Sequence, residues 1–274
     1  MRVKPPLYGR GMKRHLIVLI SCLLASLLCA ASASAMPYFE LSAPSGSYSG
    51  KTPKGWVMIV HGGGWDGVGQ GQVEKMRPEA HRFTDRGWAT MNVTYTAGGQ
   101  SLADVAGFYD VLRSKYSGKI CLFGSSAGGQ LVLMTAAARP TVSCVITEGA
   151  PTNLPAFAYQ TAYDPATKKQ QTGGPQFVYG KAVSAFGVNN LSFYSPLTWA
   201  SKINMPVLMS MAKVDALVPA AQMKAMHDAR PTKVKAVTLA SSATSGSPYT
   251  HAYLTTAGRK SWEASKSAFL LKVR

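Results

Sequence analysis

Acidic residues are scarce in this sequence: Asp and Glu number 12, against 29 Lys and Arg, in 274 residues. Charged residues make up only 15% of the chain and apolar residues 46%, a balance that excludes an intrinsically disordered protein. The basic residues are scattered and form no run or helix face, so the net charge of +17 does not indicate nucleic-acid binding.

Several motifs of cofactor and metal chemistry are also missing. The chain has no H-E-x-x-H and no C-x-x-C, so we expect neither a zinc hydrolase nor a redox or metal centre. A near match to a phosphate-binding loop at 45–52 is followed by Pro53, which blocks the helix that such a loop requires. We therefore expect no cofactor.

The first 35 residues differ in kind from the rest. Five basic residues precede an uncharged run at 16–29, and an A-x-A site ends at Ala35. This is the pattern of a secretory signal peptide, starting at Met1 or Met12. An uncleaved membrane anchor and a lipoprotein signal with Cys22 remain as alternatives. The pattern predicts a secreted or periplasmic protein after cleavage near Ala35.

Cleavage would leave a basic mature chain, 36–274, with 24 basic and 12 acidic residues and a net charge of +12. Such a charge either holds an exported protein loosely against anionic envelope surfaces or merely keeps it in solution. Two cysteines remain, Cys121 and Cys144, each within an apolar run typical of a buried strand. A disulfide is possible in an oxidising compartment, but the pattern favours buried free thiols.

Short apolar runs alternate with longer helical patterns along the mature chain. Six runs have the length and composition of strands: 56–60, 89–94, 120–123, 144–147, 206–210 and 234–239. Five segments between or after them are predicted helices: 72–86, 101–116, 127–138, 219–229 and 259–271. This alternation predicts an α/β fold whose mostly parallel central sheet has helices on both faces. Ligands of such sheets bind beyond the carboxyl ends of the strands.

The stretch at about 151–198 interrupts this rhythm. It is rich in aromatic residues, has turn signals at Gly173-Gly174-Pro175, and shows little periodicity. We interpret it as a small lid-like insertion over the edge of the sheet. Its aromatic side chains would either line a substrate pocket or form a core of the insertion itself.

The segment Gly124-Ser125-Ser126-Ala127-Gly128 lies between a predicted strand and a predicted helix. This is the context of a G-x-S-x-G nucleophile elbow, in which a strained turn exposes the serine hydroxyl. The amino end of the following helix adds a positive dipole for a developing oxyanion. Ser126 is therefore the candidate nucleophile.

A glycine-rich loop, His61-Gly62-Gly63-Gly64-Trp65, follows the first long strand. Glycines let the backbone approach a ligand and direct its amides at it. We expect the amides of Gly63, Gly64 and Ala127 to form an oxyanion hole, while His61 has a structural role.

An activated serine needs a base, and the base needs an orienting carboxylate. His251 lies in a loop after the last predicted strand and is the candidate base, because His81 and His227 fall within predicted helices. Asp215 directly follows another predicted strand and precedes a helix, so it is the candidate acid. Asp164 and Glu148 are the alternative acids.

These motifs resemble the α/β-hydrolase superfamily, and within it carboxylesterases with an HGGGW oxyanion loop and a G-x-S-A-G-G elbow. The chain order Ser126, Asp215, His251 is the one found in that superfamily. The resemblance extends from about residue 56 to the final helix. It implies a Ser-Asp-His triad with Ser126 as nucleophile, His251 as base and Asp215 as its partner.

The sequence therefore predicts an exported serine hydrolase that cleaves a small-molecule or polymer-borne ester through an acyl-enzyme. A serine peptidase or amidase of prolyl-oligopeptidase-like type is the alternative enzyme. A non-catalytic binding protein with the same fold is the alternative from another class.

Overall fold

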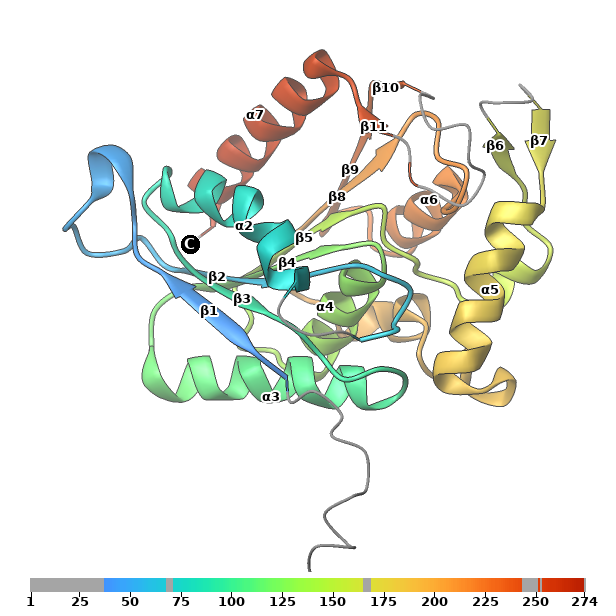
Figure 1. The fold of residues 1–274 in the computed structure, drawn as a ribbon, viewed down its shortest axis with the longest axis horizontal. Helices are drawn as coiled ribbons and strands as arrows, with labels where there is room; N and C mark the ends of the chain where they lie inside the picture. Colours follow the sequence, from blue (N-terminus) through green and yellow to red (C-terminus); the bar gives the residue numbers. More distant parts are fainter. Residues whose placement is uncertain (1–36, 68–70, 165–168, 243–250, 252, 274) are drawn as a thin grey trace, which may run out of the picture. The chain divides into compact units, whose positions relative to one another are not determined.

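A seven-stranded sheet, in the order β1-β3-β2-β4-β5-β8-β9, forms the centre of the protein (Figure 1). The computed structural model describes residues 37–67, 71–164, 169–242, 251 and 253–273, and the predicted signal peptide at 1–35 lies outside them. The strands are β1 (Phe39–Ser42), β2 (Trp56–Val60), β3 (Ala89–Val93), β4 (Ile120–Ser125), β5 (Cys144–Glu148), β8 (Val207–Ala212) and β9 (Val234–Leu239). All neighbours pair in parallel except β1, which is antiparallel to β3. The prediction of a mostly parallel sheet is confirmed.

Helices cover both faces of this sheet (Figure 1). They are α2 (Gly71–Thr84), α3 (Gln100–Lys115), α4 (Ala127–Ala138), α6 (Ala220–Ala229) and α7 (Thr256–Lys272). The helix α5 (Gly173–Phe186) belongs to the insertion. Alternate residues of the strands point to opposite faces, so Val57 and Ile59 pack with α2 and α7, whereas Met58 and Val60 pack with α3, α4 and α6. All four of these side chains are completely buried, so residues on both faces of the strand have to be apolar. This explains why the strand is a continuous apolar run.

Smaller elements lie at the carboxyl side of the sheet and in the connections. Among the described residues, β6 (Ala162–Asp164) pairs with β7 (Lys169–Gln171) and β10 (Ser241–Ser242) pairs with β11 (Tyr253–Leu254), both antiparallel. The same residues include the short 3₁₀ helices η1 (Gly46–Tyr48), η2 (Pro155–Ala158), η3 (Val188–Asn190) and η4 (Pro196–Lys202).

The interpretation of Gly173-Gly174-Pro175 as a turn is wrong, because these residues form the first turn of α5. Proline is tolerated there, since the first amides of a helix have no partner within it. The helix then buries Val178, Ala182 and Phe186.

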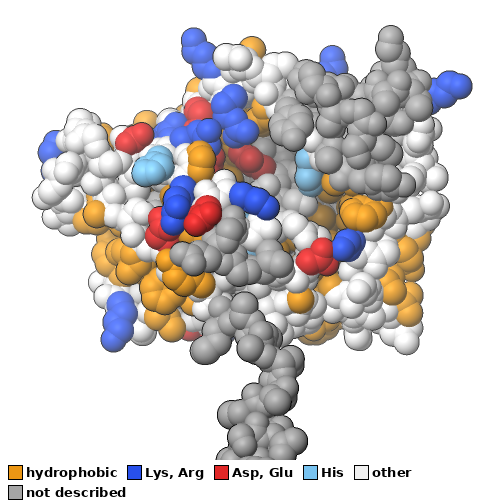
Figure 2. Space-filling view, viewed as in Figure 1, with side chains coloured by type: hydrophobic (Ala, Val, Ile, Leu, Met, Phe, Trp, Pro, Cys, Tyr) orange, Lys and Arg blue, Asp and Glu red, His pale blue; other side chains and the backbone are white. Residues whose placement is uncertain are grey.

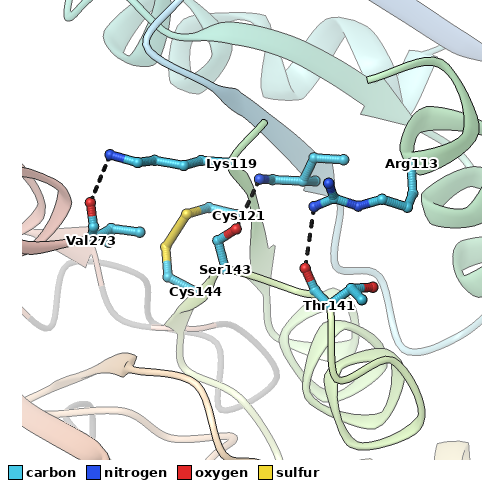
Figure 3. Close-up of a disulfide and its surroundings, with 8 residues drawn as sticks. Arg113, Lys119, Cys121, Thr141, Ser143, Cys144 and Val273 are labelled. Atoms are coloured by element: carbon cyan, nitrogen blue, oxygen red, sulfur yellow. Dashed lines mark hydrogen bonds between the residues drawn. A yellow bond between two sulfur atoms is a disulfide. The ribbon is translucent and has the colours of Figure 1, made fainter. Parts of the chain in front are cut away.

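The prediction of free thiols at Cys121 and Cys144 is also wrong. The two cysteines form a disulfide between β4 and β5, with their Cα atoms 4.6 Å apart (Figure 3). They are direct register partners in adjacent parallel strands, on the face that packs against α2 and α7. Both are completely buried. Apolar composition showed that each strand is buried but gave no information on which residues face each other.

In the described part of the chain, the helices are too short or too polar to cross a lipid bilayer.

Candidate active site

Ser126 occupies a strained turn between β4 and α4. Its backbone has φ 51° and ψ −122°, and it shares a positive φ with only one other non-glycine residue, Trp65, in the described part of the chain. Its amide donates a hydrogen bond to the carbonyl oxygen of Glu148, 2.8 Å away at the end of β5. This strained, anchored conformation is the one that a nucleophile elbow requires.

The tight turn depends on close backbone packing around two glycines. A Cβ on Gly124 would stand 2.7 Å from the amide nitrogen of Gly129, in the first turn of α4. A Cβ on Gly128 would stand 2.8 Å from the carbonyl carbon of His61, in the glycine-rich loop. Only glycine allows strand, helix and loop to approach this closely.

The three residues of the predicted triad lie within hydrogen-bonding distance in a line. His251 Nε2 is 2.8 Å from Ser126 Oγ, and His251 Nδ1 is 2.8 Å from Asp215 Oδ2. An ionised carboxylate only accepts, so Nδ1–H donates to Asp215 and Nε2 accepts from the serine hydroxyl. This is the tautomer that a general base for Ser126 needs.

Asp215 is held in place by its second carboxylate oxygen. Oδ1 accepts hydrogen bonds from the backbone amides of Leu217, at 2.9 Å, and Val218, at 3.0 Å. These residues lie in the turn between β8 and α6, at the carboxyl end of the sheet as predicted. Because both oxygens are engaged, the carboxylate is oriented before any substrate binds.

The electrostatics of the pair favour an ionised Asp215 and a basic imidazole. Burial alone would raise the pKa of Asp215, but His251 and the two backbone amides outweigh it and leave the pKa lowered. Burial alone would lower the pKa of His251, but the charge and hydrogen bond of Asp215, with a contribution from Glu148, leave it above its ordinary value. The imidazole therefore accepts a proton more readily than a free histidine does.

The glycine-rich loop is anchored by its flanking side chains. The Trp65 indole is buried and donates to Gln130 Oε1 of α4 at 2.9 Å, and Gln130 in turn donates to the carbonyl oxygen of Tyr194. His61 is also buried, stacks on the Tyr95 ring at 4.3 Å and donates from Nδ1 to the carbonyl oxygen of Gly62. Burial lowers the pKa of His61. It supports the loop, as expected.

A cavity of about 480 Å³ opens in front of Ser126. The predicted oxyanion residues Gly63, Gly64 and Ala127 line it together with Ser126 and His251. Its walls are mainly apolar, formed by Trp65, Met76, Pro151, Phe177, Val178 and Leu217. An ion pair between Lys181 and Asp66, 2.7 Å apart, closes one side.

The insertion contributes to this cavity and also packs into the main core of the protein. Phe177, Val178 and Lys181 of α5 line the cavity, whereas Phe157 and Phe186 are buried in the core that packs on α3 and α4. Phe177 therefore fits the interpretation as a pocket wall, whereas Phe157 and Phe186 belong to the same core as Met58 and Val60 of β2 and do not fit the interpretation as a core of the insertion itself. Phe177 is one of the aromatic residues that sequence reasoning offered as a pocket wall, but Lys181 was missed, because α5 was not predicted.

The remaining candidates lie elsewhere. His81 is exposed on α2, and the ring of His227 on α6 bonds through Nδ1 to the carbonyl oxygen of Val234. The side chain of Asp164 lies outside the described residues. Glu148 stands beside the site, where its side chain accepts hydrogen bonds from Trp262 and Arg259 and makes none to His251. Within the described ranges, His, Cys, Asp and Glu side chains form no group that could hold a metal ion.

Comparisons with known proteins agree with this architecture. Residues 47–229 match the family model described as BD-FAE. A search of curated proteins finds no matching sequence.

Solved structures share the fold at low sequence identity. A puromycin-hydrolyzing peptidase from Mycobacterium tuberculosis is similar with a TM-score of 0.65 and 18% identity, over 86% of this chain and 37% of that one. A bacterial heroin esterase is similar with a TM-score of 0.60 and 15% identity, over 94% and 90%. The Francisella virulence factor BioJ is similar with a TM-score of 0.61 and 17% identity, over 93% and 91%. This chain thus spans little more than a third of the peptidase.

Proposed function

Because this chain belongs to the BD-FAE family of α/β hydrolases, we propose that it is a serine hydrolase that cleaves carboxylic esters through an acyl-enzyme. The observation that carries the proposal is the line of hydrogen bonds from Asp215 through His251 to Ser126, which ends at a cavity. A non-catalytic binding protein would have no need of a strained serine aligned with a buried acid and a base.

The reaction follows from this arrangement. Ser126 Oγ attacks the ester carbonyl while His251 Nε2 takes its proton, and Asp215 stabilises the imidazolium that forms. The amides of Gly63, Gly64 and Ala127 hold the oxyanion, helped by the dipole at the start of α4. His251 then gives the proton to the leaving alcohol. Water attacks the acyl-enzyme by the same route and releases the acid.

The cavity indicates the class of ester. Its volume of about 480 Å³ and its apolar walls suit a medium-sized apolar group next to the scissile bond. The two charged side chains at its side, Lys181 and Asp66, are paired with each other. We therefore expect esters of medium-length or ring-bearing acids to be better substrates than acetates.

We also propose that the protein acts outside the cytoplasm, either secreted or in a periplasm. The disulfide between Cys121 and Cys144 supports this location, because disulfides persist in oxidising compartments. The signal-like sequence at 1–35 points the same way.

Labelling by a fluorophosphonate probe tests the nucleophile. The wild type and Ser117→Ala, which alters an exposed serine, should be labelled, whereas Ser126→Ala should not. Labelling of Ser126→Ala, or no labelling of the wild type, would refute the proposal.

A substrate panel tests the reaction. p-Nitrophenyl esters of two to twelve carbons are compared with aminoacyl p-nitroanilides. We expect hydrolysis of the esters with an optimum at medium chain length. Hydrolysis of the anilides alone would instead identify the protein as a peptidase or amidase.

A further inference from the structure

A cluster of charged side chains lies beside the candidate active site, where α2, α7 and the end of β5 meet. Figure 2 shows Lys and Arg side chains gathered on this face, with acidic side chains between them. The cluster consists of Glu79, Arg82 and Arg86 of α2 and its following turn, Glu148 of β5, and Arg259, Glu263 and Lys266 of α7. The ester mechanism described above makes no use of it.

Glu148 connects this cluster to the elbow. Its backbone oxygen accepts the amide hydrogen of Ser126 at 2.8 Å. Its side chain is only 23% exposed, and Oε1 accepts hydrogen bonds from the Trp262 indole and from Arg259, the latter at 3.2 Å. One residue thus contacts the nucleophile turn with its backbone and α7 with its side chain.

The carboxylate of Glu148 also shares a small cavity with the base. This second cavity, of about 140 Å³, is lined by His251 and Asp215 together with Glu148 and Arg259. Gly149 also lines this cavity, and a Cβ there would stand 3.4 Å from the His251 ring and 3.7 Å from the Asp215 carboxylate. Ser126 lines the larger cavity instead. Glu148 therefore faces the base from a cavity that Ser126 does not line.

We propose that Glu148 is a positioning residue for the ester hydrolysis: across the small cavity, its negative charge favours the protonated His251 that forms in each step. Asp215 is the near carboxylate and Glu148 the more distant one. The inference rests on the proposed function, since it assigns a role in the same reaction. Arg259 and the Trp262 indole hold the carboxylate in place and favour its ionised form.

The other charges near His251 do not replace this effect. Arg259 lines the small cavity and pairs with Glu148. The large cavity is lined by three charged side chains, Asp66, Lys75 and Lys181. Asp66 and Lys181 form an ion pair and neutralise each other. The carboxylates of Asp215 and Glu148 are the charges that raise the pKa of His251. Residues 243–250, which precede His251, include no Asp, Glu, Lys or Arg.

Glu148 is itself sensitive to the cluster. Burial and the nearby Glu79 raise the pKa of Glu148. The charges of Lys266 and Arg259 and the hydrogen bond from Trp262 lower it, but the net result is a raised pKa. The cationic side chains of Lys266 and Arg259 thereby favour the charged carboxylate that faces the base.

The pH dependence of kcat/KM tests the proposal on p-nitrophenyl esters. Glu148→Gln keeps an oxygen for Trp262 but removes the negative charge that favours protonated His251. The acid limb of the kcat/KM profile should therefore move to lower pH. At pH 5.5 its kcat/KM, relative to its own plateau, should exceed that of the wild type by about three- to tenfold. KM should change little, because Glu148 does not line the large cavity.

Two further variants separate charge from folding. Glu148→Asp retains the charge and should keep the acid limb of the wild type even if kcat falls. Glu263→Gln removes a carboxylate from the same cluster, away from the small cavity, and should also keep it. An unchanged acid limb in Glu148→Gln, or an equal shift in Glu263→Gln, would overturn the inference.

A second readout does not depend on turnover. The low-field proton NMR signal of His251 Nδ1–H reports the titration of the ring, and in Glu148→Gln it should titrate at lower pH than in the wild type. If the wild type hydrolyses no ester and is not labelled, the proposed function fails, and this titration still decides whether Glu148 acts on His251.

Discussion

Replacing Gly128 by alanine tests how the glycine-rich loop and the elbow are held together. The new Cβ would stand 2.8 Å from the carbonyl carbon of His61 and nearer still to the carbonyl oxygens of Val60 and His61. Ordinary contacts at such a position are 3.4–4 Å. Because the opposing atoms are backbone, they cannot rotate away as a flexible side chain does. Gly128→Ala must therefore separate the loop from the start of α4.

The expected cost follows from this overlap. Overpacking typically destabilises a protein by about 1–3 kcal/mol, and contact with rigid backbone on the opposite side favours the upper end, about 3 kcal/mol. In a domain of this size, each kcal/mol lowers Tm by roughly 2–4 °C, so Tm should fall by roughly 6–12 °C. Moving the loop also displaces the amides of Gly63 and Gly64, and loss of one oxyanion donor lowers kcat by about 10²–10³.

The matched control is Gly107→Ala in α3, where an added Cβ meets no heavy atom within 4 Å. It should leave activity unchanged and stabilise the helix by about 0.5–1 kcal/mol. Thermal unfolding followed by circular dichroism, and ester hydrolysis at 25 °C, measure both effects. If Gly128→Ala melts with the wild type and hydrolyses esters at the same rate, the loop is not held by this contact and the reasoning is wrong.

Four further outcomes are expected. The pKa of His251 is raised, and only the neutral imidazole acts as a base. In a pH–rate profile, kcat/KM should therefore fall with decreasing pH through a midpoint above the ordinary histidine pKa of about 6.5. A midpoint below that value would contradict the expectation. Cys121→Ala with Cys144→Ala should lower the free energy of unfolding by about 3 kcal/mol in urea titrations, given a sequence separation of 23 residues. Phe157→Ala should destabilise the completely buried core by about 3–5 kcal/mol, which the same titrations measure. Phe177 lines the cavity and is itself 41% exposed, so Phe177→Ala should instead raise KM for medium-chain esters with little change in Tm.

The middle of the central sheet was predictable because β2, β3, β4, β5 and β8 are almost entirely buried on both faces. All six predicted runs are strands, and each of the five predicted helices is present within a few residues of the expected bounds. A strand covered by helices on both sides has to be apolar throughout, and the sequence shows that directly. The edge strand β1 leaves Phe39 and Leu41 exposed, so its four residues carry no comparable signal.

Three features required information that a single sequence does not contain. The pairing of Cys121 with Cys144 depends on the register between β4 and β5. The helix α5 begins with two glycines and a proline, which are more frequent in turns. The place of Glu148 beside His251 depends on contacts between residues more than a hundred positions apart.

The candidate site was predicted in greater detail than its surroundings. Ser126 and Asp215 follow β4 and β8 of the parallel sheet, and His251 lies between β10 and β11, beyond β9. Because strand ends meet at one edge, their proximity could be inferred from chain order and fold class. The structure brings the three side chains together, and their catalytic roles stay a prediction until they are tested. Part of the cavity wall, formed by Pro151, Phe177 and Val178, comes from the insertion, whose fold was not predictable.

The residues of the site are far apart in the sequence, and this has a consequence for the protein during its synthesis. Ser126 and His251 are 125 residues apart, and the contact between Glu148 and Trp262 spans 114. A ribosome completes the elbow long before it reaches the histidine or α7. In the mechanism proposed above, a nascent or prematurely terminated chain therefore carries a serine without its base. Such a chain does not hydrolyse the esters around it, and it gains activity only after the histidine has been translated.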